Sequence, residues 1–191
     1  MKLQGIIVRS REGETSRGRE IIDTIIVFLV TILIGLLILN FVGQRTYVHG
    51  QSMEPHLSEG NQVIVDKISY RFRDPSRFEV VVFPYQYEVN TYFIKRVIGL
   101  PGEQVQIIDG SIYINGQVLV EDYGLEVMLE GGLATDPIQL QDDEYFLLGD
   151  NRNRSLDSRS PRVGAVTRCE LLGRAWLRIW PLEDFGFIPH E

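Results

Sequence analysis

The sequence predicts a mostly β domain preceded by one N-terminal transmembrane helix. Two observations carry this prediction. A nearly unbroken apolar run covers residues 21–42, and beyond it the chain is a series of short β-branched and aromatic runs separated by turn residues. A chain of 191 residues accommodates one modest globular domain and such a helix. We therefore expect a tail at 1–20, an anchor at 21–42 and a globular domain at 43–191.

The apolar run is long enough to cross a membrane. The residues that interrupt it are Asp23, Thr24, Thr31 and Asn40. As a helix rising about 1.5 Å per residue, the run spans a bilayer core of about 30 Å. A buried helix of a soluble protein is disfavoured because no polar face repeats at the helical period. A cleaved signal peptide is disfavoured too, since residues 43–47 offer no cleavage site of small residues.

Basic residues set the expected orientation. Those that precede the run are Lys2, Arg9, Arg11, Arg17 and Arg19, and Arg45 alone follows it closely. This excess predicts a single-pass protein of the cell membrane with a cytoplasmic N-terminus and an extracytoplasmic domain. Up to Asp23, five bases against four acids give +1, so the total of −7 leaves −8 for the rest. The lipid bilayer is thus an expected partner, and nucleic acid is not.

The strands of the outer domain follow from β-rich runs between turn signals. The expected strands are 62–67, 80–84, 91–99, 104–109, 111–114, 145–149 and 173–179. Asp109-Gly110 and Asn115-Gly116 predict tight reversals. The segment 123–143 is acidic and weakly patterned, and we expect it to be a surface excursion. The lone Cys169 is expected to be a small core residue.

Ser52 is a candidate nucleophile. It lies in the sequence Gly50-Gln51-Ser52-Met53-Glu54-Pro55, a few residues beyond the apolar run. An ordinary turn would also explain this sequence taken by itself. The position near the membrane surface favours a functional role, and Met53 and Leu57 would then line an apolar pocket beside the hydroxyl.

Lys95 is a candidate general base, in the sequence Phe93-Ile94-Lys95-Arg96-Val97. A serine hydroxyl needs a base to take its proton, and a lysine can do so only when neutral. Burial must lower its pKa from about 10.4, which costs about 3 to 4 kcal/mol for a shift of 2 to 3 units. The sequence neighbours are apolar, and no carboxylate lies nearer than Glu88 and Glu103. Most strand lysines are solvated, so this apolar context is the distinguishing feature.

A third polar stretch runs from Gly149 to Arg159. Its Asp, Asn and Ser side chains would suit a self-capped loop. A Ser-Lys dyad also needs a group that orients the amine without holding it charged, and Ser155 and Ser158 are both available. Asp157 and Arg159 are expected to form an ion pair that fixes the loop.

Other catalytic arrangements fit less well. In a Ser-His-Asp triad, His49 or His56 would act on a serine in its own local segment, where the hydrogen bond is hard to arrange, and His190 lies near the terminus. Three histidines and one cysteine show no zinc-ligand spacing, so we expect neither a metal nor another cofactor.

The three motifs, in this order behind an N-terminal anchor, resemble bacterial type I signal peptidases, also called leader peptidases, in a compact single-anchor form. The resemblance extends from the anchor to Gly173-Arg174-Ala175. It implies the coiled β-sheet fold shared with LexA-like repressors. It also implies the removal of signal peptides from exported preproteins, with cleavage after small residues at −1 and −3 and transient contact with the secretion machinery.

The resemblance also implies roles for particular residues. Ser52 is the nucleophile, Lys95 the general base and Ser155 the orienting hydroxyl. Asp157 and Arg159 support the site, and Gly149 and Asp150 shape its wall. The residues implied to form shallow substrate pockets are Val48, Met53, Leu57, Phe93 and Ile94.

Two positions depart from the pattern of some relatives. Gly50 stands where some have an oxyanion-stabilising serine, so the backbone N–H of Ser52 must do more of that work. His56 replaces a threonine. Two further functions stay open: a LexA-like Ser-Lys autopeptidase, and a catalytically silent, membrane-tethered β-domain that binds exported chains.

Overall fold

The chain divides into two units, residues 1–41 and 42–191. The computed structural model describes residues 12–41 and 43–189, with side chains of the helix described for residues 18–35.

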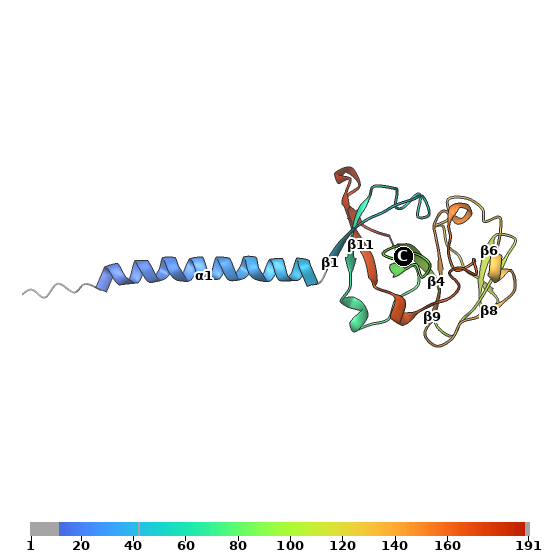
Figure 1. Ribbon diagram of the computed structural model, residues 1–191, viewed down its shortest axis with the longest axis horizontal. Helices are drawn as coiled ribbons and strands as arrows, with labels where there is room; N and C mark the ends of the chain where they lie inside the picture. The colour runs from blue at the N-terminus through green and yellow to red at the C-terminus, as the bar shows by residue number, and fades with distance from the viewer. Residues whose placement is uncertain (1–11, 42, 190–191) are drawn as a thin grey trace, which may run out of the picture. The chain divides into compact units, whose positions relative to one another are not determined.

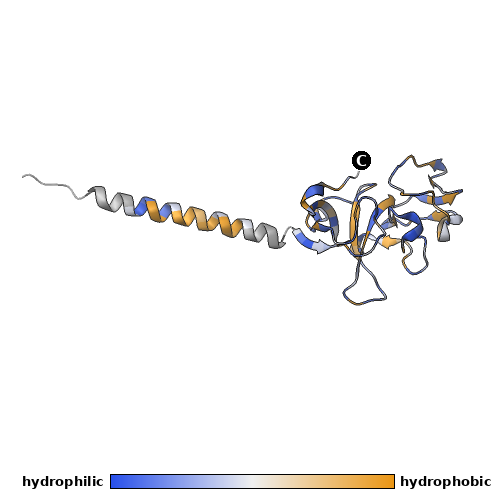
Figure 2. Ribbon diagram, turned by 90° about the horizontal axis from the view of Figure 1, so that it is seen from above, coloured by the Kyte–Doolittle hydropathy of each residue, from blue (hydrophilic) through white to orange (hydrophobic). Residues whose placement is uncertain are grey.

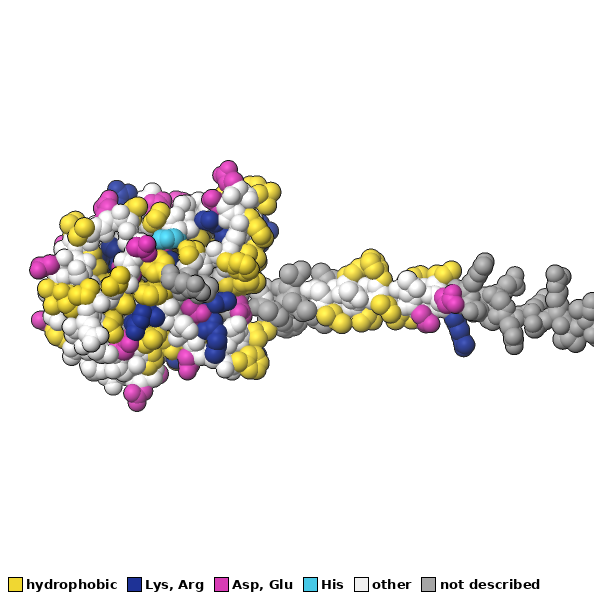
Figure 3. Space-filling view, turned by 180° about the vertical axis from the view of Figure 1, so that it is seen from behind, with side chains coloured by type: hydrophobic (Ala, Val, Ile, Leu, Met, Phe, Trp, Pro, Cys, Tyr) yellow, Lys and Arg dark blue, Asp and Glu magenta, His cyan; other side chains and the backbone are white. Residues whose placement is uncertain are grey.

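The first unit contains helix α1, Glu12–Phe41. The helix begins before the apolar run, so the expected tail is partly helical. Thr24 and Thr31 donate their hydroxyl protons to the carbonyls of Glu20 and Val27, at 2.7 and 2.8 Å, which satisfies both inside the helix. Figure 2 shows the described part of α1 as mostly hydrophobic, and Figure 3 shows charged side chains at its N-terminal side. Within the described residues, no helical stretch combines the length and the hydropathy that a bilayer crossing requires.

The second unit is built on a large antiparallel sheet (Figure 1). Its strands are β1 (Gly43–Tyr47), β2 (Gln62–Asp66), β3 (Val80–Pro84), β4 (Tyr92–Gly99), β9 (Glu144–Leu148), β10 (Val166–Thr167), β11 (Gly173–Trp180) and β12 (Gly186–Phe187). The order across the sheet is β1-β2-β11-β3-β4-β9-β10, with β12 paired to β11. Strand β1 therefore stands at one end of this order. Strand β4 lies inside it, with β3 on residues 92–96 and β9 on residues 96–99.

A smaller sheet has the order β7-β6-β5-β8. Its strands are β5 (Gln104–Ile108), β6 (Ser111–Ile114), β7 (Gln117–Val118) and β8 (Ile138–Gln139). The predicted reversals join β5 to β6 and β6 to β7. Both residues of each turn have positive φ, between 48° and 78°, which is the geometry of type I′ hairpin turns that Asp-Gly and Asn-Gly favour.

The seven expected strands are all present, within about one residue at each end. The strands that were not expected are short or polar: β1, β7, β8, β10 and β12. The remaining regular elements are the 3₁₀ helices η1 (Ser69–Arg71), η2 (Gly132–Thr135), η3 (Arg152–Arg154), η4 (Arg168–Glu170) and η5 (Leu182–Asp184). A run such as Gly43–Tyr47 lacks apolar alternation, and its pairing with β2 makes it a strand.

The segment 123–143 is mostly exposed, and its description as a surface excursion stays a prediction. Met128, Ala134 and Leu140 nevertheless pack into a core cluster with residues of the small sheet. Their spacing shows neither a helical nor a strand period, so no local pattern marks this burial. One expectation about burial is wrong. Cys169 is exposed rather than in the core, in η4 at the surface.

Candidate active site

Ser52 lies in a turn that follows β1. The N–H of Leu57 bonds to the carbonyl of Met53 at 2.9 Å, and the carbonyl of Ser52 accepts the N–H of Asn151 at 3.0 Å. Met53 and Leu57 are buried in a core cluster with Val48 and Val63. The turn is therefore held by its apolar side chains, which leaves the polar Ser52 at the surface of a groove.

Lys95 reaches Ser52 from β4. The distance from Lys95 Nζ to Ser52 Oγ is 2.7 Å, a hydrogen-bond distance, and Nζ also donates to the carbonyl of Ile94 at 2.9 Å. The lysine is 3% exposed. The structure thus brings the predicted nucleophile and base together across 43 residues of sequence.

Burial lowers the pKa of Lys95 to about 8, because the ammonium form loses its hydration. The carboxylates of Asp157 and Asp150 oppose this shift. The expectation that no carboxylate lies near the lysine concerned its neighbours in sequence, and the fold brings two others close to it. These two carboxylates come from the distant loop 149–159. Each is paired with an arginine, Asp150 with Arg96 and Asp157 with Arg159.

A groove of about 250 Å³ opens above the dyad. Its lining includes Val48, Phe93 and Ile94, three of the five residues expected to contact substrate. Met53 and Leu57 are not among the lining residues, so their contact with substrate stays a prediction. The lining residues that sequence reasoning missed are Thr46, Tyr47, His49, Gln51, Val82, Tyr92, Arg154 and Leu156. Nothing in their local sequence marks them, because they come from several segments, β1 and the turn after it, β3, β4 and the loop 149–159, which meet only in the fold.

The loop 149–159 forms a wall beside the groove. Ser155 has extended backbone, with φ −120° and ψ 127°, so neighbouring side chains point to opposite sides. Arg154 and Leu156 line the groove, whereas Ser155 and Asp157 line a second cavity of about 350 Å³. The segment 154–157 thus lies between the groove and the second cavity.

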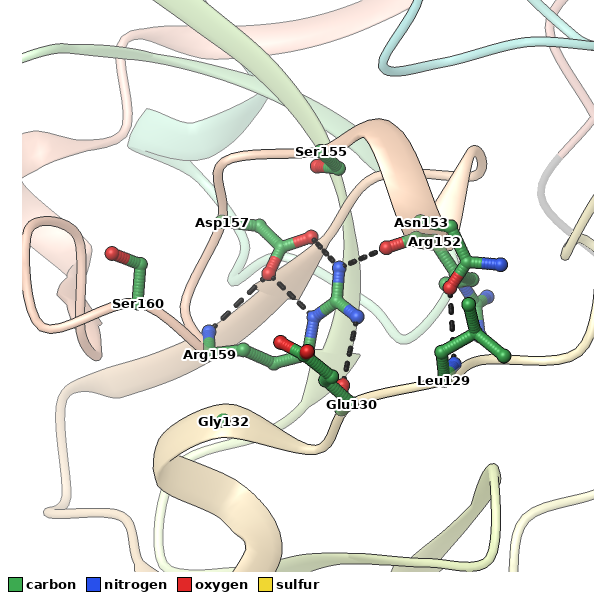
Figure 4. Close-up of a pocket in the computed structure, with 9 residues that line it drawn as sticks. All are labelled: Leu129, Glu130, Gly132, Arg152, Asn153, Ser155, Asp157, Arg159 and Ser160. Atoms are coloured by element: carbon green, nitrogen blue, oxygen red, sulfur yellow. Dashed lines mark hydrogen bonds and ion pairs between the residues drawn. The ribbon is translucent and has the colours of Figure 1, made fainter.

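The expected ion pair fixes this wall. Arg159 Nε and Nη2 each donate to the Asp157 carboxylate at 2.9 Å, as Figure 4 shows. Asp157 Oδ2 also accepts the N–H of Gly149 at 3.1 Å, and Arg159 Nη1 donates to the carbonyl of Glu130 at 3.1 Å. A bidentate pair with low exposure is among the stronger side-chain contacts.

Ser155 lies close to the dyad without a hydrogen bond to it. Its Oγ is buried and has no hydrogen-bond partner among the described residues. A Cβ at Gly149 would lie 2.2 Å from this Oγ and 2.4 Å from the carbonyl oxygen of Ser52. Only glycine permits this close approach of three segments. The orienting role of Ser155 stays a prediction.

Asp150 pairs with Arg96 on the other side of β4. Both are 0% exposed, and the two distances are 2.8 Å from Nε to Oδ1 and 2.7 Å from Nη2 to Oδ2. Arg96 Nη1 donates to the carbonyls of Phe78 and Pro189, and its guanidinium lies 3.7 Å from the ring centroid of Tyr123. Burial alone would raise the pKa of Asp150, but the hydrogen bonds from Arg96 and the nearby His56 imidazole hold it below its usual value.

The histidines do not form a triad with Ser52 in the described part of the chain. His56 Nδ1 lies 3.1 Å from Asp150 Oδ2, His49 lines the groove, and His190 lies outside the described residues. Among the residues that the structure covers, no group of three or more His, Cys, Asp or Glu side chains is placed to hold a metal ion.

Gly50, two residues before Ser52, has no side chain that could serve as a second oxyanion donor. Its φ of +83° lies in the left-handed region, and a Cβ there would meet no atom within 4 Å. A second oxyanion donor at this position would therefore fit sterically but strain the backbone.

Comparison with known proteins identifies the family of this chain. The family described as "Signal peptidase, peptidase S26" matches residues 21–180. A probable signal peptidase I-2 of Synechocystis sp. is 39% identical over 85% of this chain and 75% of its own. The signal peptidase I of Bacillus amyloliquefaciens is 30% identical over 93% of this chain and 97% of its own.

A crystal structure of a signal peptidase I from Enterococcus faecalis is 35% identical and covers 53% of this chain and 97% of that chain, with a TM-score of 0.45. The family match spans most of the sequence, and the Synechocystis relative is aligned over three quarters of its own length. This chain belongs to the signal peptidase family, peptidase S26.

Proposed function

We propose that this chain is a membrane-anchored type I signal peptidase that removes signal peptides from exported preproteins with a Ser52-Lys95 dyad. The observation that carries the proposal is the 2.7 Å approach of Ser52 Oγ to a buried Lys95 Nζ at the side of an open groove. A pKa of about 8 makes about a tenth of the amine neutral at pH 7, against less than one in a thousand at the ordinary value.

The dyad acts in two steps. Neutral Lys95 takes the Ser52 proton while Oγ attacks the scissile carbonyl, and the resulting ammonium protonates the leaving amine as the peptide bond breaks. Water then loses a proton to the same amine and attacks the ester, which releases the acyl group and restores Ser52. The backbone N–H of Ser52 is the proposed oxyanion donor, since Gly50 supplies no side chain.

The groove suits an extended peptide. Residues 46–52 form one side of it and residues 92–95 the other. A substrate strand laid between them would gain main-chain hydrogen bonds, and side-chain pockets would supply specificity. Val48, Phe93 and Ile94 would limit the pockets to small residues at −1 and −3, so selectivity comes largely from excluding larger side chains.

The proposed anchor is the apolar run at 21–42, with the N-terminus cytoplasmic and the catalytic domain outside the cell membrane. Support comes from the sequence, in the length of the run and the basic residues before it. Of these residues, Lys2, Arg9 and Arg11 lie outside the described part of the chain. Ser52 follows the apolar run by only about ten residues of sequence, so the proposed substrate is a signal peptide that the secretion machinery delivers at the lipid bilayer.

The test is cleavage of a model preprotein by the full-length chain in lipid vesicles. We expect Ser52→Ala and Lys95→Ala to fold and to lose cleavage by at least about a thousandfold, because each removes one half of the dyad. Ser58→Ala, a change at an exposed serine near the same turn, is the matched control and should cleave normally.

Three outcomes would contradict the proposal. Near-normal cleavage by either dyad variant would exclude the dyad. Absence of processing by the wild type, with no labelling of Ser52 by a serine-reactive probe, would favour a binding domain. Cleavage of the chain itself and not of the preprotein would favour a LexA-like autopeptidase.

A further inference from the structure

The arginines of the loop 149–159 differ in their partners. Arg152 and Arg159 are each paired with a carboxylate, at 2.7 and 2.9 Å. Arg154 pairs with no carboxylate in the part of the chain that the structure describes, and the acceptor of its side-chain hydrogen bond is a neutral amide. The charge of Arg154 therefore has no counter-charge, whereas the other two arginines of the loop are neutralised.

Arg154 faces the groove next to the nucleophile. It is one of the groove-lining residues, and its Nη1 donates to Oε1 of Gln51, the residue directly before Ser52, at 3.0 Å. A guanidinium carries five N–H donors, so this one bond leaves others for a further partner. Both Arg154 and Gln51 are exposed. A bound substrate can therefore reach the guanidinium.

The charge of the groove is positive. Its lining includes Lys95 and Arg154, and no Asp or Glu of the described residues is among the lining residues. Lys95 is 3% exposed and acts as a base only when neutral, so the accessible permanent charge comes from Arg154. The chain as a whole carries a net charge of −7, which makes this cation a local exception. A carboxylate is the side chain that such a groove attracts.

The proposed function indicates which part of the substrate meets Arg154. In that proposal the side chains at −1 and −3 lie along Val48, Phe93 and Ile94, so the residues before the scissile bond follow β1 and β4 away from the dyad. The chain after the scissile bond then leaves on the side of the dyad where Arg154 lies. An extended strand rises about 3.3 Å per residue, so three residues beyond the bond span about 10 Å.

We propose that Arg154 is a specificity-determining residue that binds a carboxylate on one of the first three residues of the mature protein, at +1 to +3. The inference rests on the proposed function. A planar guanidinium can bind a carboxylate through two parallel hydrogen bonds, which adds geometric specificity to the attraction of charge. A preprotein with Asp or Glu directly after the cleavage site is the preferred substrate. One with Lys or Arg there is a poorer substrate, because like charges meet.

The test compares model preproteins that differ in one residue, in cleavage by the full-length enzyme in lipid vesicles. Glu, Gln or Lys is placed at +1, +2 or +3 in turn, and kcat/KM is measured for each preprotein. At one or more of these positions we expect Glu to exceed Gln by about three- to fivefold, the effect of an exposed ion pair, and Lys to fall below Gln. The advantage of Glu should shrink at high salt, because the pair is accessible to ions.

Variants of Arg154 then assign this preference. Arg154→Gln should bring the ratio of Glu to Gln to about one, and Arg154→Glu should favour Lys over Gln instead. A merely structural role of Arg154 would not exchange the preference in this way. The matched control is Arg71→Gln, which removes the same charge at an exposed position in η1 and should keep the wild-type ratio.

Equal cleavage of the Glu and Gln preproteins at all three positions by the wild type would overturn the inference. A preference for Glu that persists in Arg154→Gln would overturn it too, as would an equal loss of the preference in Arg71→Gln, which would assign it to net charge. Each of these outcomes leaves wild-type cleavage and its loss in Ser52→Ala intact, so failure of the inference is distinguishable from failure of the proposed function.

Discussion

Lys95 and Arg96 are neighbours on β4 and meet opposite environments. Both are buried, at 3% and 0% exposure. Arg96 has a bidentate carboxylate, two carbonyls and an aromatic ring around it. Lys95 has a hydroxyl, one carbonyl and the ring of Phe93, whose centroid is 5.0 Å from Nζ, and its nearest carboxylates are already paired with arginines.

The difference shows how one strand can hold a structural cation and a base side by side. Alternation along the strand sends the two side chains to opposite faces. Full pairing compensates the buried charge of Arg96, so that this residue serves the fold. Sparse pairing makes the charged form of Lys95 costly, and its pKa falls to about 8. The number of pairing partners on each face of β4 therefore decides whether the buried cation is structural or can act as a base.

Replacing Lys95, the cation with few pairing partners, by an arginine should have the largest effect. Lys95→Arg keeps a buried cation, but a guanidinium does not lose its proton in the working pH range. We expect cleavage of a preprotein to fall by at least about a thousandfold, measured as kcat/KM. Ser58→Ala is again the control. Retention of a tenth of the activity would show that a buried cation suffices without proton transfer.

Removing the charge of Asp150, the carboxylate partner of Arg96, should destabilise the domain. Asp150→Asn leaves Arg96 buried without its counter-charge, and we expect the free energy of unfolding to fall by about 3 kcal/mol. Urea unfolding followed by tryptophan fluorescence measures it. The matched control replaces both partners, as Arg96→Met with Asp150→Leu, and should recover much of the loss. A loss below about 1 kcal/mol in the single variant would mean that the pair is not the main support of this face.

Replacing Lys95 by an apolar residue should stabilise the domain. The pKa of Lys95 is about 8 in the folded chain and about 10.4 when unfolded, so the unfolded state binds more protons between these values. Wild-type stability therefore rises with pH across this window. We expect Lys95→Met to be about 2 kcal/mol more stable at pH 7, with the difference shrinking above pH 8. Urea unfolding at pH 7 and pH 10 checks both points, and a less stable variant at pH 7 would contradict them.

Much of the fold could be predicted because its signals are local. The Asp-Gly and Asn-Gly turns, and the β-branched runs that became β3 and β6, carry their structure in a few residues. The short strands could not be predicted, since β7, β8, β10 and β12 have two residues each and exist only through their partners. The burial of Met128 and Leu140 depends in the same way on packing against distant strands.

The candidate site shows the same division. Ser52, Lys95 and the Asp157–Arg159 pair have recognisable local sequences, and the structure brings them to one place. The carboxylates near Lys95 could not be found this way, because Asp150 and Asp157 approach it only through the pairing of β4 with β9. The contact of His56 with Asp150 could not be found from the local sequence either, because it spans 94 residues.

The central claim is that β4 keeps Lys95 neutral enough to act as a base. Titration of the Lys95 Nζ resonance by NMR in the folded enzyme tests it most directly, with Lys95→Met identifying the signal. We expect a midpoint near pH 8, well below those of exposed lysines. A midpoint near 10.5, the ordinary lysine value, would contradict the account.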